Sequence, residues 1–176
     1  GYMAQKFSLY GNLSVEQNLR FFSGVYGLRG RAQNEKIARM SDAFGLKSIA
    51  SHATDELPLG FKQRLALACS LMHEPDILFL DEPTAGLDPI GAAAFDSLIR
   101  TLRDALNLTV FLVTHDLDTL YTLCDRVAVL SQKKVLVVDT LDKVAATDDG
   151  WIQAYFHGPR GRAAYQAAAI NSGERL

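Results

Sequence analysis

The feature that most constrains the fold is a short apolar run that ends in two carboxylates. Ile77–Leu80 is apolar throughout, and Asp81 and Glu82 follow it directly. A continuous apolar run of this length predicts a strand buried in a sheet. Such a strand would hold both carboxylates in fixed places at its end. There the first could bind a magnesium ion and the second could address a water molecule.

Three further segments stand at compatible places around this strand. Leu57–Arg64 contains a glycine turn and leads into a predicted helix at Leu65–Met72. Ala85–Pro89 follows the carboxylates as a short acidic loop, and Thr109–Asp116 is a second apolar strand with His115 at its tip. The order is therefore glycine turn, helix, strand, paired acids, acidic loop, helix, strand and histidine.

This order resembles the nucleotide-binding domain of ABC transporters, with Asp81 and Glu82 in the Walker B position. The resemblance covers nearly the whole chain and is most specific from Gln63 to Asp88. It implies an α/β fold, the P-loop NTPase (ABC ATPase) fold, in which a mostly parallel sheet is joined to an α-helical subdomain. Strands alternate with helices after Asp88, which also favours a parallel sheet that binds ligands at the carboxyl ends of its strands.

Bulk composition fits one globular domain. The chain has 176 residues, of which 48% are hydrophobic and 22% are charged, both ordinary values. A net charge of −2 gives no reason to expect nucleic acid as a partner. No apolar run is long enough to cross a bilayer, so we expect membrane contact to be indirect. Cys69 and Cys124 match no metal spacing and predict buried thiols in a reducing compartment.

The resemblance divides the chain into four segments. Residues 1–11 resemble the Q-loop region, residues 12–75 the helical subdomain and signature helix, residues 76–140 the α/β core from Walker B to the H-loop, and residues 141–176 a C-terminal helix and tail. No Gly-x-x-x-x-Gly-Lys-Ser/Thr loop occurs in the sequence, and in the family this P-loop lies upstream of the Q-loop. We therefore expect a partial domain without the Walker A loop and the N-terminal strands, which alone binds ATP poorly.

Apolar periodicity predicts the main helices. Ser14 and Gln17 fit a capping box at the start of the first helix. The next helix would span residues 33–44, with Gly45 at its C-terminus. The residues expected to face inward on these two helices are Val15, Leu19, Phe22, Tyr26, Ile37, Met40 and Phe44. Later elements are expected as helices at Pro89–Leu106 and Leu117–Cys124, and as strands at Val110–Thr114, Arg126–Leu130 and Lys134–Asp139.

The resemblance implies roles in ATP hydrolysis for four residues. Glu82 would be the general base and His115 would contact the γ-phosphate. Asp81 would hold Mg²⁺ through a water molecule, and Gln5, as the Q-loop glutamine, would contact Mg²⁺ or the attacking water. Three of these residues have structural alternatives. Glu82 could cap a helix, His115 could be satisfied by the backbone, and Gln5 could be a polar residue in a surface loop.

The signature segment departs from the family pattern. It contains Pro58, which has neither a hydroxyl nor an amide hydrogen, where the family has serine. The family's glycine amides embrace the γ-phosphate bound to the opposite subunit, so we expect a weakened half-site and an asymmetric dimer. In the D-loop, Asp88 would act across the dimer interface. The residues of the signature segment expected to meet ATP are Leu59, Gly60, Phe61, Lys62 and Gln63.

The two halves of the chain resemble ATPases with different substrates. Tyr2–Pro75 resembles ATPases of drug and antibiotic exporters, in some of which a Leu-Pro-Leu-Gly signature also occurs. From Ala85 on, the chain resembles ATPases of the Mla/Mce phospholipid systems, through Leu112–Leu120 and Trp151–Ala164. We therefore expect phospholipid transport, with drug or antibiotic export as the alternative. A soluble ABC ATPase of repair or translation is less favoured, because no tandem domain, coiled-coil insertion or strongly basic surface is visible.

The expected cofactors and partners follow from the same resemblance. ATP and Mg²⁺ would be bound, and a second ATPase subunit would complete a homodimer or heterodimer. Transmembrane permease subunits would bind near the exposed residues of Phe7–Asn12. The subunit would then lie in the cytoplasm, on the inner face of the plasma (inner) membrane.

Overall fold

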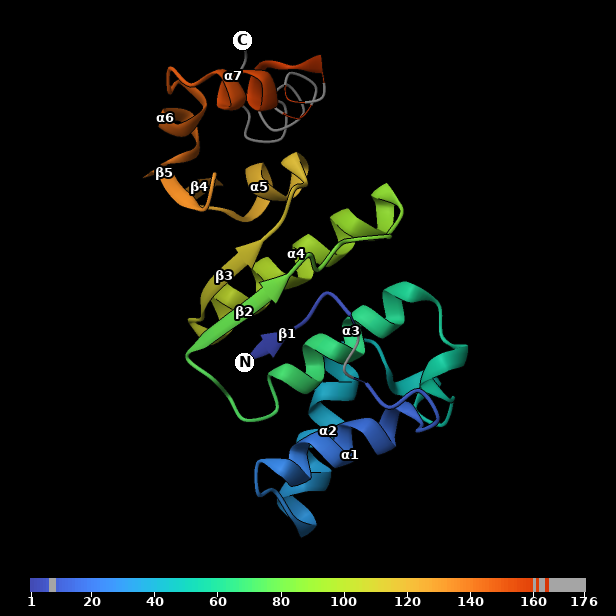
Figure 1. The fold of residues 1–176 in the computed structure, drawn as a ribbon. Coiled ribbons are helices and arrows are strands. Elements are labelled where there is room, and N and C mark those ends of the chain that lie inside the picture. The colour runs from blue at the N-terminus through green and yellow to red at the C-terminus, as the bar shows by residue number, and fades with distance from the viewer. Residues whose placement is uncertain (7–8, 160, 162–163, 165–176) are drawn as a thin grey trace. The chain divides into compact units, whose positions relative to one another are not determined.

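The structure is a computed structural model that describes residues 1–6, 9–159, 161 and 164 (Figure 1). The chain forms two compact units, Gly1–Val113 and Thr114–Leu176, and each is described by itself. The predicted core segment 76–140 is therefore divided between the units. Phe7 and Ser8 of the predicted permease contact, and most of the predicted tail after Pro159, lie outside the described residues.

The first unit contains a three-stranded parallel sheet. Its strands are β1 (Tyr2–Met3), β2 (Ile77–Asp81) and β3 (Thr109–Val113), in the order β1-β2-β3. The register pairs Asp81, the last residue of β2, with Val113, the last residue of β3. The prediction of a parallel sheet is confirmed, and this pairing places the carboxyl ends of β2 and β3 at one edge.

Side chains on β2 alternate between two faces of the sheet. Leu78 and Leu80 are buried, whereas Phe79 points to the other face, is 48% exposed and stacks on Phe111 of β3 with ring centroids 5.2 Å apart. The expectation that the whole run is buried was therefore wrong, because successive side chains of a strand point to opposite faces. Figure 1 shows α4 (Pro89–Leu106) running along the sheet, and this helix has the predicted bounds.

The remainder of the first unit is helical. It comprises α1 (Val15–Val25), α2 (Gly30–Ala43) and α3 (Leu59–Ser70), with short 3₁₀ turns at Lys47–Ile49 and Thr54–Glu56. The capping box is confirmed: the Gln17 amide donates to Ser14 Oγ at 3.2 Å, and the Ser14 amide donates to Gln17 Oε1 at 2.8 Å. The prediction that Tyr26 faces inward was wrong. It is the C-cap of α1, is 47% exposed and stacks on His73.

Helix α3 begins earlier than predicted. Its first residue is Leu59, so the signature residues form its first turn rather than a loop before a helix at Leu65. Pro58 is the N-cap, with φ −55° and ψ 149°. Proline suits the start of a helix because its ring fixes φ and it has no N–H that would lack a partner there.

Buried Asn18 links the Q-loop segment to the segment before α3. Its side chain is fully buried. The Tyr10 amide donates to Asn18 Oδ1 at 2.9 Å, and Asn18 Nδ2 donates to the Tyr10 carbonyl at 2.9 Å and to Thr54 Oγ1 at 3.0 Å. Backbone hydrogen bonds from Thr54 to Leu13 and from Asp55 to Gly11 join the same two segments. The end of the Q-loop region and the approach to α3 are therefore held together.

We expect Asn18→Ala to lower the free energy of unfolding by about 1–3 kcal/mol, because it removes the hydrogen bonds of Asn18 to the Tyr10 amide, the Tyr10 carbonyl and the buried Thr54 hydroxyl. Urea denaturation would measure the change. Asn34→Ala is the control, since exposed Asn34 accepts a hydrogen bond only from the exposed Arg20 side chain among the bonds described. It should change stability by less than about 0.5 kcal/mol. Equal stability of the two variants would contradict the proposed importance of Asn18.

The second unit packs helices against a β-hairpin. Its elements are α5 (Leu117–Leu123), β4 (Val127–Ser131), β5 (Lys134–Asp139), α6 (Leu141–Ala145) and α7 (Gly150–His157). Strands β4 and β5 are antiparallel, which confirms the predicted hairpin, and Gln132 and Lys133 in its turn have positive φ. The core of this unit contains the side chains of Leu120, Val127, Val129, Val144, Ile152 and Phe156.

The described part of the chain bears on the expected lack of a membrane span and on the expected buried thiols. None of its helices is both long and apolar enough to cross a membrane. Cys69 is buried and Cys124 is half-buried, and neither forms a disulfide among the described residues. Burial raises the pKa of the Cys69 thiol, because the charged thiolate would lose its hydration.

Candidate functional site

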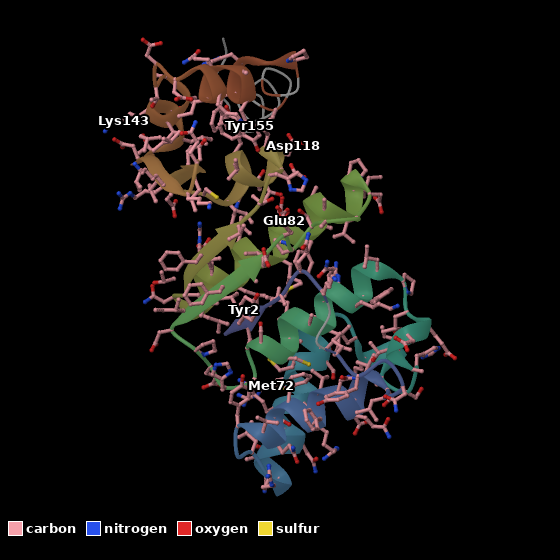
Figure 2. All side chains as sticks on the ribbon, in the orientation of Figure 1. Tyr2, Met72, Glu82, Asp118, Lys143 and Tyr155 are labelled. Atoms are coloured by element: carbon pink, nitrogen blue, oxygen red, sulfur yellow. The ribbon has the colours of Figure 1, made fainter. Side chains whose placement is uncertain are left out.

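The two carboxylates lie where β2 ends. Asp81 is the last residue of β2, and both Asp81 and Glu82 are half-buried. Glu82, which follows Asp81, is labelled in Figure 2. A carboxylate oxygen is the type of ligand that Mg²⁺ prefers. Asp81 therefore fits a magnesium-binding role by its chemistry. The described residues contain no group of three or more histidine, cysteine or acidic side chains that could hold a metal ion by themselves. Further oxygen ligands would come from the phosphates and water.

The backbone of Glu82 is in the left-handed region, with φ 48°. This conformation costs a residue with a Cβ about 1–2 kcal/mol. The Glu82 amide donates to the Val113 carbonyl at 2.8 Å, so the hydrogen bonding between β2 and β3 continues one residue beyond β2. A strained backbone that is held by its surroundings is typical of functional sites.

The structural alternative for Glu82 was that it caps the next helix. That role belongs to Asp88, which is the N-cap of α4. Asp88 Oδ1 accepts hydrogen bonds from the amides of Ile90 at 3.0 Å and Gly91 at 2.9 Å. The alternative was therefore wrong for Glu82, and Asp88 has a structural role in addition to its predicted role at a dimer interface.

The acidic loop lies against the first turn of α3. Gly86 has φ 79°, and a Cβ added there would lie 3.0 Å from Leu59 Cδ2. A Cβ added to Gly60 would lie 3.9 Å from Leu87 Cδ2. The structure thus brings the predicted D-loop and signature segments of one chain together. Glycine is needed at position 86, because a side chain would be strained in this conformation and crowded by Leu59.

The N-terminus of α3 has the general properties of an anion-binding helix end. The first amides of a helix lack the usual partner four residues earlier and attract negative charge. In α3 the Phe61 amide donates instead to the Pro58 carbonyl at 3.0 Å. Pro58 provides no side-chain cap there. Gly60 and Phe61 are half-buried, Lys62 Nζ donates to the Asp55 carbonyl at 3.0 Å, and Gln63 is only 3% exposed. The ATP contacts of all the signature residues stay predictions.

The two remaining residues with predicted catalytic roles are Gln5 and His115. Gln5 is exposed and follows β1 in the first unit. His115 is exposed and belongs to the second unit, where its carbonyl oxygen accepts a hydrogen bond from Tyr155 Oη at 2.7 Å. This bond involves the backbone of His115 and not its ring, so the catalytic role of His115 and its structural alternative both stay predictions. The contact between Tyr155 and His115 was not predicted, because nothing in the sequence pairs residues that are 40 positions apart.

The strain at Glu82 predicts an unusual preference for glycine. We expect Glu82→Gly to unfold with a free energy about 0.5–1 kcal/mol higher than Glu82→Ala, since relief of the left-handed strain exceeds the entropy cost of glycine. Both variants lose the same side chain, so its contacts cancel in the comparison, which urea denaturation would measure. As a control, Ala94→Gly on the exposed face of α4 should lower stability by about 1 kcal/mol. A Glu82→Ala variant more stable than Glu82→Gly would contradict the strain.

Comparison with known proteins finds a family match over the first part of the chain. Residues 1–85 match the family described as ABC transporter. The chain is 67% identical to the "Probable multidrug ABC transporter ATP-binding protein YbhF" of Escherichia coli K12 over 146 residues, which are 83% of this chain and 25% of that protein. It is 27% identical to cbiO1 from Clostridium perfringens, part of the ABC transporter complex cbiONQ, with a TM-score of 0.72 over 94% of this chain and 65% of that one.

The chain has the fold of ABC transporter ATP-binding domains and is similar to them in sequence over the residues compared. A second solved structure with this fold is the dimeric ATP-binding cassette MJ0796 in a post-hydrolysis state with ADP and Pi. Its TM-score is 0.70 at 25% identity, over 80% of this chain and 62% of that one. The predicted fold class is therefore confirmed. The chain spans about a quarter of the length of the Escherichia coli relative.

Two further relatives bear on the substrate. The "Fluoroquinolones export ATP-binding protein MT2762" of Mycobacterium tuberculosis is 37% identical over 131 residues, 74% of this chain and 42% of that protein. The "Methionine import ATP-binding protein MetN" of Streptomyces griseus is 33% identical over 147 residues, 84% of this chain and 41% of that protein. None of these three relatives is described as a lipid transporter. The expected phospholipid substrate is not supported, and drug export, the alternative, fits better.

Proposed function

We propose that this domain hydrolyses ATP to drive an ABC exporter of drug-like compounds. The observation that carries hydrolysis is the placement of Glu82, whose backbone is held by β3 directly after Asp81. The high identity to a multidrug transporter protein, together with the fluoroquinolone exporter among the relatives, supports the class of substrate.

In this mechanism each residue acts on ATP or on the attacking water. Glu82 accepts a proton from the water as the water bonds to the γ-phosphorus, while the bond from that phosphorus to the β-phosphate oxygen breaks and ADP leaves. Asp81 would hold Mg²⁺, and Gln5 would contribute to the same site. When bound, Mg²⁺ neutralises charge on the phosphates. His115 contacts the γ-phosphate and keeps it in line with the water.

A second ATPase subunit would complete the site. The helix α3 of one subunit would direct its first-turn amides at the γ-phosphate held by the other, because a helix N-terminus favours anions. The dimeric structure among the solved relatives supports this arrangement. The lack of a hydroxyl at Pro58 would weaken this contact with the γ-phosphate. The packing of Gly86 on Leu59 would connect the D-loop of each chain with the first turn of its own helix α3.

A permease subunit would bind the domain beside the Q-loop region. Tyr10, Phe21 and Tyr26 are large and partly exposed there, and Tyr10 packs edge-on against Phe21 with ring centroids 4.7 Å apart. A small cavity of about 50 Å³, lined in part by Met3 and Tyr26, opens beside them. Exposed aromatic side chains are enriched at protein interfaces. The domain would thereby be held on the cytoplasmic face of the membrane.

The hydrolytic role predicts the effect of removing one carboxylate. Glu82→Gln in the protein that carries this chain should lower ATP turnover at least ~100-fold, the scale of losing a general base. Phosphate release by the purified protein would measure it. Glu56→Gln, at an exposed acidic residue, is the matched control and should leave turnover unchanged. Retained turnover in Glu82→Gln would exclude Glu82 as the base.

The substrate class can be tested with the same variant. Inverted membrane vesicles that contain the transporter should accumulate a fluoroquinolone when ATP is added, and vesicles with Glu82→Gln should not. Transfer of a labelled phospholipid, measured in parallel, should not differ between the two. ATP-dependent phospholipid transfer without drug uptake would reverse the assignment.

A further inference from the structure

The peptide group between His115 and Asp116 is held at both ends within the second unit. Tyr155 Oη donates to the His115 carbonyl at 2.7 Å, and the Asp116 amide donates to Thr114 Oγ1 at 3.1 Å. A peptide group is planar, so two hydrogen bonds on opposite sides restrict its rotation. They thereby restrict the backbone on both sides of the peptide, including ψ of His115.

Asp116 is also fixed by the helix that follows it. It is the N-cap of α5, and its Oδ1 accepts hydrogen bonds from the amides of Asp118 at 2.9 Å and Thr119 at 3.4 Å. Thr119 and Leu120 in the first turn of α5 are buried. The residue after His115 is therefore anchored to the core of the unit.

Tyr155 is itself rigidly supported. Its ring stacks on Trp151, with centroids 5.0 Å apart and an angle of 11° between the planes, and meets Phe156 edge-on at 5.1 Å. Helix α7 is capped by Asp149 and anchored by the buried side chains of Ile152 and Phe156. Figure 2 shows Tyr155 on α7 near the start of α5, which carries Asp118.

We propose that Tyr155 is a positioning residue for His115, so that the C-terminal helix α7 contributes to ATP hydrolysis. This inference rests on the proposed role of His115 at the γ-phosphate. A histidine whose backbone is already fixed loses less freedom when its ring meets the transition state, and such pre-organisation accelerates the chemical step. Tyr155 contributes through the His115 carbonyl, without touching ATP itself.

Tyr155→Phe tests this directly, because it keeps the aromatic packing and removes only the hydroxyl. We expect kcat for ATP in the whole transporter to fall about 3- to 10-fold, which corresponds to one ordinary hydrogen bond, with KM for ATP unchanged. The control is His157→Ala on the same helix, whose Nε2 lies 2.9 Å from the Ala145 carbonyl. Its kcat should stay at the wild-type value.

A double-mutant cycle with His115→Ala shows whether Tyr155 acts by positioning His115 or by stabilising the second unit as a whole. If Tyr155 acts through His115, adding Tyr155→Phe to His115→Ala should lower kcat no further. An unchanged kcat in Tyr155→Phe, an equal loss in both backgrounds, or the same loss in His157→Ala would overturn the proposal. Full turnover in His115→Ala alone would refute the proposed role of His115, and the role of Tyr155 with it.

Discussion

The pairing of β2 with β3 is the interaction on which the carboxylate site depends. It continues past the last residue of β2, because the Glu82 amide donates to Val113. This bond helps to hold Glu82 in a left-handed conformation that an isolated chain would rarely adopt. The chain then turns at Gly86 and enters α4 through the Asp88 cap. The position of Glu82 is thus set by strand register before a ligand arrives, which is how a pre-organised site avoids reorganisation during the reaction.

The parts of the fold that could be predicted are those with local causes. The bounds of α4 follow from Asp88 at the N-cap and Pro89 at the first position, two signals that act within a single helical turn. The capping box of α1 and the bounds of β5 are local in the same sense. Asp81 and Glu82 could be found because the apolar run before them makes a strand whose end is unambiguous.

The features that could not be predicted depend on contacts between distant residues. The left-handed backbone of Glu82 arises from its bond to β3, and the contact of Tyr155 with His115 joins residues 40 positions apart. The start of α3 was predicted too late. Pro58 suits the position before a helix, so the helix begins at Leu59 and not at Leu65. Exposure of Phe79 depends on what covers each face of the sheet, which a continuous apolar run does not reveal.

The comparisons do not support the expected phospholipid substrate, and the reason is related. Short stretches around His115 and in the C-terminal segment suggested lipid transport, but the chemistry of ATP hydrolysis is the same whichever compound is moved. Residues that hold phosphates, magnesium and water therefore carry little information about the cargo, and a shared fold carries less. Identity over 146 residues covers 83% of this chain, far more than the short stretches that suggested lipid transport. The longer match is therefore the better support for the proposed drug export.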